Sequence, residues 1–274
     1  MIEVLAEPLG EAFMRRALLE ITLVGITSGL LGCWVILFGV SYAAESMAHA
    51  LLPGLVLAAL AAAPLLAGAV PGIALAGIAI FLLSRAPGID RDTAVAVAVT
   101  GLLGLGSLLA LSASTPPGLA DLLFGDVLGT SGADLALAMA LAIAIMVALR
   151  LLHGSLLATG FDPATAREQG VRPALAEFGL LFLLAGTILV AVQALGNLLV
   201  VAVLVGPAAT ARLLCNRVGP MMAVSSGLAV GLGIAGLYVS YYAGTAAGAS
   251  IALAMVLAYA VAALLPLGRP LRSG

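Results

Sequence analysis

The fold of this chain is decided by residues 21–60, which read ITLVGITSGLLGCWVILFGVSYAAESMAHALLPGLVLAAL. They begin a long apolar stretch that continues to Ser84, and Glu45 and His49 are its only carboxylate and imidazole. Apolar stretches of this length indicate helices that span a membrane. Because ionisable groups are costly to desolvate inside a bilayer, Glu45 and His49 indicate a path for a substrate or an ion.

The composition of the whole chain is that of a membrane protein. Its 274 residues are 63% hydrophobic and 9% charged, with a mean hydropathy of +1.24, whereas charged residues make up about 25% of a typical soluble domain. The net charge of -2 and the lack of lysine argue against nucleic acid as a partner, because binding phosphates needs a basic surface. We therefore predict an all-α, polytopic membrane protein with one membrane-spanning domain, residues 1–274.

Turn residues and charges divide the chain into about nine candidate spans, since each span needs about 20 mostly apolar residues. The spans cover approximately residues 17–39, 43–65, 68–84, 93–112, 134–152, 174–192, 195–214, 220–239 and 247–266. Eight or ten spans stay open as alternatives. The positive-inside rule places the N-terminus outside and the C-terminus in the cytoplasm, because every arginine except Arg15 and Arg16 then lies inside.

Glycine spacing predicts close contacts between these helices. The chain has 33 glycines, and small residues four apart let membrane helices approach each other closely. The pairs with this spacing are Gly25/Gly29, Gly68/Gly72, Gly227/Gly231 and Gly244/Gly248.

Glu45 and His49 are four residues apart, so a helix places both side chains on one face. Tyr42 lies on roughly the same face, and Ser46 lies nearby. Pro53 has no N–H, which leaves the His49 carbonyl without its helical partner. A carboxylate, an imidazole and a carbonyl or water suit Zn²⁺ and Mn²⁺. We predict a transient metal site at Glu45 and His49, lined or supported by Tyr42, Ser46 and Pro53. In the alternative, the pair only forms hydrogen bonds within the protein.

Residues 161–171 predict a short helix on the cytoplasmic side. Asp162 can cap the helix, Pro163 suits its first position, and Gly170 can terminate it. A helix this short and polar does not span a membrane, but it can dock into a groove on a soluble partner. Farther along the chain, Pro207 can bend the seventh span and Arg212 can anchor it at the headgroups, which predicts an architectural or gate-forming element.

Three segments of the chain resemble the permease subunits of ATP-binding-cassette importers for zinc, manganese and iron, the ABC-3 family. They are ESMAHALLPG at 45–54, the run from FDP at 161–163 to Gly170, and PAATARLL at 207–214. The family usually has Gly-Asp at the positions of Ala44 and Glu45, where this chain has Ala-Glu. The resemblance implies the permease fold of the vitamin B12-type importers, a homodimer, and a location in the inner or plasma membrane.

The same resemblance implies which partners the chain has. It implies a cytoplasmic ATPase that hydrolyses ATP on a separate chain, and an extracytoplasmic solute-binding protein that delivers Zn²⁺ or Mn²⁺. This sequence has no phosphate-binding loop ending in Gly-Lys-Ser/Thr, so we expect no enzymatic activity and no permanently bound cofactor. The resemblance assigns ATPase coupling to the short helix, with Phe161, Asp162, Pro163, Ala166, Arg167 and Gly170.

Three other functions stay open. The first is a permease for a metal chelate or a vitamin B12-like substrate, although a Glu/His pair favours a bare ion. The second is an intramembrane metalloprotease, which needs a His-Glu-x-x-His helix or an equivalent third ligand. The third is a proton-coupled transporter, which usually has more buried acids along its path.

Overall fold

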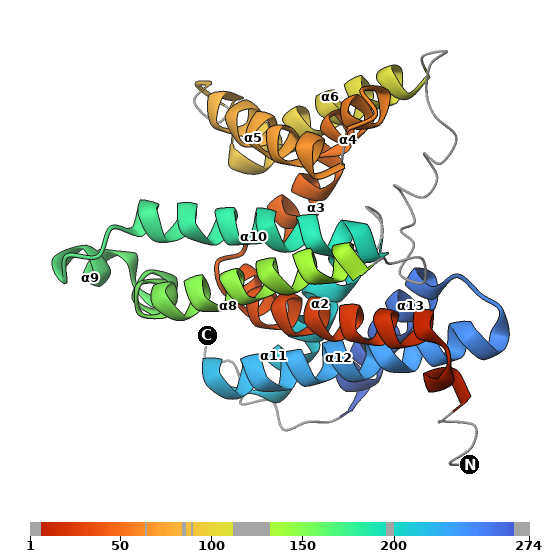
Figure 1. Ribbon diagram of the computed structural model, residues 1–274. Helices are drawn as coiled ribbons and strands as arrows, with labels where there is room; N and C mark the ends of the chain where they lie inside the picture. The colour runs from red at the N-terminus through yellow and green to blue at the C-terminus, as the bar shows by residue number, and fades with distance from the viewer. Residues whose placement is uncertain are drawn as a thin grey trace.

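The computed structural model describes residues 7–63, 65–83, 86–88, 90–111, 132–195 and 200–265 (Figure 1). All regular secondary structure in these residues is helical, which confirms the all-α prediction. The principal helices are α2 (Ala12–Leu37), α3 (Ser41–Ala50), α4 (Leu52–Leu60), α5 (Leu65–Leu83), α6 (Arg91–Ala110), α8 (Gly132–Phe161), α9 (Pro163–Glu168), α10 (Pro173–Leu195), α11 (Val200–Leu214), α12 (Val218–Ala243) and α13 (Ala247–Leu264).

The helices form two groups that meet at α3 (Figure 1). The larger group contains α2, α8 and α10 to α13, and the smaller group contains α4, α5 and α6. Ala44 and Met47 of α3 are buried in the core of the larger group. Ala50, at the end of α3, is buried with Ala76 of α5 and Val95 of α6. The helix that carries Glu45 and His49 is therefore held by both cores.

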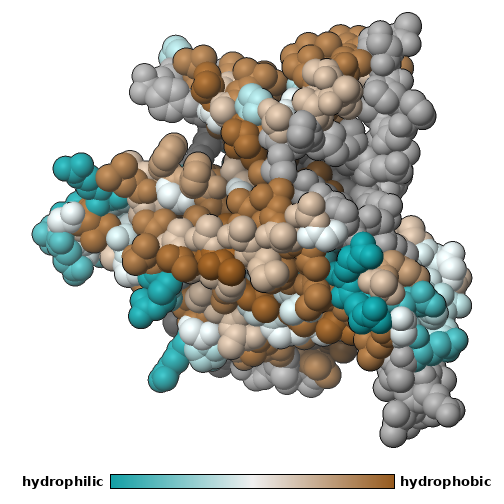
Figure 2. Space-filling view, in the orientation of Figure 1, coloured by the Kyte–Doolittle hydropathy of each residue, from teal (hydrophilic) through white to brown (hydrophobic). Residues whose placement is uncertain are grey.

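Seven helical segments of the described chain are long and apolar enough to cross a membrane. They are Ala12–Leu37, Ser41–Leu60, Asp92–Ala110, Leu135–Phe161, Pro173–Val192, Val218–Ala243 and Ala247–Leu264, and two shorter apolar helices are Val70–Ile80 and Val200–Leu214. Hydrophobic residues cover much of the visible flank of the larger group, and hydrophilic residues gather around α9 and at the opposite end (Figure 2). The polytopic character is confirmed, whereas the count of nine spans and the orientation stay predictions.

The second predicted span, 43–65, overlaps the candidate span Ser41–Leu60. Within it, the helix is divided at Leu51 into α3 and α4, and Pro53 stands in the first turn of α4. Proline has no N–H and its ring crowds the preceding turn, which accounts for the break. Helix α4 then ends at Leu60, before a turn in which Ala62 has a φ of 51°.

The helix that contains the fifth predicted span, 134–152, is longer than that span. Helix α8 continues to Phe161 and has 30 residues, which corresponds to about 45 Å at the usual rise per residue. Its last part packs along α2, because the His153 ring lies edge-on to Trp34 with centroids 5.4 Å apart. The whole helix is thus longer than a hydrocarbon core of about 30 Å.

Two of the four glycine pairs make the predicted close contacts. A Cβ added at Gly29 would lie 2.6 Å from the Ser226 Cα, so α2 and α12 touch through their backbones. Gly68 and Gly72 contact α4 from inside α5, which agrees with their place in the predicted span 68–84. Gly227 and Gly231 have no neighbour within 4 Å in the described chain, so that prediction is wrong within one chain. In the fourth pair, Gly244 ends α12 in the left-handed conformation and Gly248 is buried in α13.

Candidate functional site

Helix α3 brings Tyr42, Glu45 and His49 to one face, as the sequence predicts. Tyr42 is 44% exposed, Glu45 is exposed and His49 is partly exposed. On the other side of the helix, Ala44 and Met47 are buried in the larger core. Helix α3 therefore presents a carboxylate, an imidazole and a phenol on its open side.

Helix α3 ends directly after His49. Its last residue is Ala50, and α4 begins at Leu52 with Pro53 in its first turn. Leu51 keeps helical dihedral angles and its carbonyl accepts the Leu55 N–H at 3.1 Å, whereas the His49 carbonyl has no Pro53 N–H to bind. Discontinuous membrane helices use such carbonyls to bind ions. The missing N–H of Pro53 therefore leaves one candidate oxygen ligand, the His49 carbonyl, beside the Glu45 and His49 side chains.

Ser46 and Pro53 support this face from inside the protein. Ser46 is 3% exposed and Pro53 is buried, so neither lies on the open side of the helix with Tyr42 and Glu45. Among the described residues, no three His, Cys, Asp or Glu side chains form one cluster. Glu45 and His49 thus offer two side-chain ligands, fewer than the four of a typical structural zinc site.

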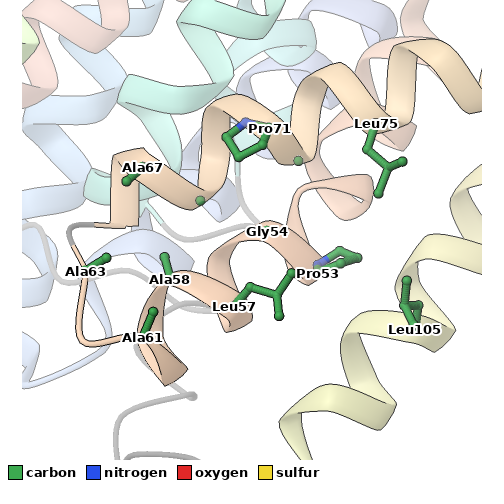
Figure 3. Close-up of a pocket in the computed structure, with 12 residues that line it drawn as sticks. Pro53, Gly54, Leu57, Ala58, Ala61, Ala63, Ala67, Pro71, Leu75 and Leu105 are labelled. Carbon is green, nitrogen blue, oxygen red and sulfur yellow. The ribbon is translucent and has the colours of Figure 1, made fainter.

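A cavity of about 320 Å³ lies beside Pro53, between α4, α5 and α6 (Figure 3). It is lined by apolar residues that include Pro53, Gly54 and Leu57 of α4, Leu75 of α5 and Leu105 of α6. Metal ions bind to oxygen, nitrogen or sulfur ligands. This lining offers no such side chain, so the cavity is not a candidate metal site.

The predicted short helix is present as α9, with six residues. The Asp162 carboxylate accepts hydrogen bonds from the backbone N–H of Ala164 at 3.0 Å and of Thr165 at 3.2 Å. The side-chain hydrogen bond from Thr165 is the main reason why the pKa of Asp162 lies below its ordinary value. The Asp162 cap is therefore ionised at neutral pH.

The end of α9 also follows the prediction. Gly170 has a φ of 80°, and the N–H of Val171 reaches back to the Ala166 carbonyl at 2.9 Å, which is the closing bond of a Schellman motif. Ala166 anchors the helix with 1% exposure, whereas Phe161 is 70% exposed and Arg167 is exposed. The buried Ala166 thus fixes one side of the helix, and the other side is exposed. The coupling role of this helix stays a prediction.

Pro207 lies inside a continuous α11, and Arg212 is exposed in the last turn of that helix. One turn before Pro207, a Cβ added at Gly32 of α2 would lie only 1.9 Å from the Leu204 carbonyl oxygen. This contact shows that α11 packs closely against α2 just before Pro207. Its role as a gate stays a prediction.

One buried acid was missed from the sequence. Glu20 is 2% exposed within α2, and buried ionisable groups in membrane helices are uncommon. Glu20 directly precedes the apolar stretch from Ile21 to Ser84, which therefore does not include it. Because Glu20 lies inside the predicted span 17–39, the sequence already indicates an acid within a membrane helix.

Comparison with known proteins identifies the chain. Residues 11–265 match the ABC 3 transport family. The chain belongs to this family. It is 32% identical to the manganese import system permease protein ScaB of Streptococcus gordonii over 249 residues. This aligned region covers 91% of this chain and 90% of ScaB. It is 29% identical over 262 residues to the chelated iron transport system membrane protein YfeD of Yersinia pestis, covering 96% and 88% of the two chains.

A solved structure supports the same assignment. PsaBC from Streptococcus pneumoniae in complex with Fab has a chain that matches this ABC 3 family member with a TM-score of 0.90 and 31% identity, over 99% of both chains. The family resemblance and the permease fold predicted from the sequence are therefore confirmed. The protein is a multi-pass protein of the plasma membrane, as its apolar helices and its family indicate.

Proposed function

We propose that this chain is the permease subunit of an ATP-driven importer of divalent transition-metal ions, with Mn²⁺ as its main cargo. The observation that carries the proposal is the Glu45/His49 pair on the open face of a broken helix, in a family whose relatives are named for manganese and iron transport. Carboxylate and carbonyl oxygens suit Mn²⁺, while an imidazole adds affinity for later transition metals. Fe²⁺ and Zn²⁺ are then competing cargoes.

The open face of α3 favours a second copy of the chain as a partner. Glu45 and Tyr42 are exposed on a helix whose other side is buried. A charged side chain at the bilayer centre costs about 3 kcal/mol or more when it faces lipid. In our proposal two permease domains, each of residues 1–274, face each other across this surface and enclose the metal path.

Two other partners complete the proposed importer. A cytoplasmic ATP-binding-cassette ATPase docks on α9, the short capped helix at one end of the bundle (Figure 1). An extracytoplasmic solute-binding protein delivers the ion to the opposite end. ATP is hydrolysed on the ATPase, and the permease supplies the path.

The function is tested by transport in proteoliposomes that contain this chain and its ATPase. We expect ATP-dependent uptake of radioactive Mn²⁺ when the binding protein is present, and no uptake without ATP. Fe³⁺ bound to a siderophore serves as the second substrate, because one relative is named for chelated iron. Uptake of the chelate without uptake of free Mn²⁺ would replace the bare-ion proposal with the chelate permease.

The proposed topology has nine spans with the N-terminus outside. It is supported by the grouping of α9 with the end of α11 and the start of α12 at one end of the bundle (Figure 1). The exposed arginines Arg167, Arg172, Arg212 and Arg217 belong to these segments and their connections. Basic residues near span ends favour the cytoplasmic side.

Cysteine labelling tests this orientation at the two ends of α12. Asn216 and Ala246 are both exposed, one before and one after the helix. In a variant with Cys33 and Cys215 replaced by alanine, we expect Asn216→Cys to react with an impermeant maleimide only after the cells are opened. Ala246→Cys should react in intact cells, and the reverse pattern would overturn the topology.

A further inference from the structure

We propose that three glycines, Gly68 and Gly72 of α5 and Gly106 of α6, position the α3–α4 break and thereby His49 for metal binding. We call this set the glycine cradle. The inference rests on the proposed function of Glu45 and His49, and it assigns the cradle glycines as positioning residues that do not touch the ion.

The first contact of the cradle joins the backbones of α4 and α5. A Cβ added at Gly68 would lie 2.0 Å from the Gly54 carbonyl oxygen and 2.6 Å from the Ala58 Cβ. In the other direction, a Cβ added at Gly54 would lie 2.1 Å from the Gly68 carbonyl oxygen. Any side chain at Gly54 or Gly68 would therefore push the two helices apart.

The other two glycines contact the break itself. A Cβ added at Gly72 would lie 3.2 Å from the Leu51 carbonyl oxygen, and one added at Gly106 would lie 2.9 Å from the Pro53 nitrogen. The turn between α3 and α4 is thus held from α5 on one side and from α6 on the other. Leu51 follows His49 by two residues, so the cradle sets the place of the His49 carbonyl.

The cavity beside Pro53 borders the cradle, since Gly68 and Gly72 are among its lining residues. It lies between α4, α5 and α6 and is about 320 Å³ in volume (Figure 3). In a fully packed interior, an added methyl group forces side chains and backbone out of their preferred conformations. Here α4 has room to shift, so we expect a methyl group in the cradle to move the break while the helices stay assembled.

The same two helices carry matched controls. Gly77 in α5 and Gly104 in α6 have no neighbour within 4 Å of an added Cβ. Alanine is a better helix former than glycine, so Gly77→Ala and Gly104→Ala should not weaken either helix. Any effect that is specific to the cradle variants therefore comes from the contact with α4.

The test measures Mn²⁺ uptake by Gly68→Ala and Gly106→Ala against Gly77→Ala and Gly104→Ala in the reconstituted complex. Misplacing a binding group by about 1 Å can cost about 100-fold. We expect the half-saturating Mn²⁺ concentration of the cradle variants to rise by about tenfold or more, with an altered preference between Mn²⁺ and Zn²⁺. The controls should stay within about twofold of the unchanged protein.

A packing role alone would give a different result. It would lower the amount of assembled permease and the maximum rate, and it would leave the half-saturating concentration and the metal preference unchanged, which would overturn the inference. If Gly68→Ala does not assemble, Gly72→Ala decides, because its closest contact of 3.2 Å needs only a small shift. Failure of the unchanged protein to transport any metal would instead refute the proposed function.

Discussion

Replacing His49 with alanine is expected to reduce Mn²⁺ uptake by about 100-fold or more, since loss of a residue that only supports a metal ligand already costs 10–100-fold. Glu45→Ala should have an effect of the same size. Each substitution leaves one of the two proposed side-chain ligands on the open face of α3, together with the backbone carbonyl of residue 49. The measurement is uptake of radioactive Mn²⁺ by cells that depend on this importer.

Conservative variants separate loss of the ligand from loss of the helix. Glu45→Gln keeps the size of the side chain and removes its charge, so we expect it to fail like Glu45→Ala. Glu45→Asp keeps the carboxylate, and the family usually has aspartate at this position, so it should retain uptake with a changed metal preference. Asp92→Asn is the control, because Asp92 is an exposed carboxylate in the first turn of α6. Full uptake by a normally assembled His49→Ala variant would remove His49 from the path.

Local chemistry explains what could be predicted from the sequence. Apolar runs of about 20 residues marked the spans, and each of them overlaps a helix of the structure. The short helix was predicted from Asp162, Pro163 and Gly170, whose side-chain or backbone preferences act within a few residues. The shared face of Glu45 and His49 followed from a spacing of four. In each of these cases the determining residues are neighbours in the sequence.

Contacts between distant segments explain what could not be predicted. The extension of α8 to Phe161 follows α2, where His153 meets Trp34, and hydropathy alone ends that span near residue 152. The role of Gly68 and Gly72 depends on how close α4 comes to α5. Pro53 indicated a missing hydrogen bond, but the division of the helix at Leu51 also depends on its neighbours in α5 and α6.

Removing the cap of α9 is expected to uncouple ATP hydrolysis from transport. A helix of six residues is too short to be stable by itself, so its end groups decide whether it forms. Asp162→Ala removes the hydrogen bonds to the N–H groups of Ala164 and Thr165. Gly170→Val places a β-branched residue at a φ of 80°, a conformation that such residues rarely adopt. We expect both variants to reach the membrane and to lose most of the metal-stimulated ATP turnover.

Arginine variants then distinguish the shape of α9 from its surface. Arg167 is exposed in the last turn of α9, whereas Arg172 is exposed just before α10. If the ATPase docks on α9, Arg167→Ala should reduce the amount of ATPase that copurifies with the permease, and Arg172→Ala should leave it unchanged. Equal copurification and equal ATP turnover in all four variants would show that the ATPase binds elsewhere. Because none of these residues lies near Glu45, such a result would leave the proposed metal path intact and refute only the docking assignment.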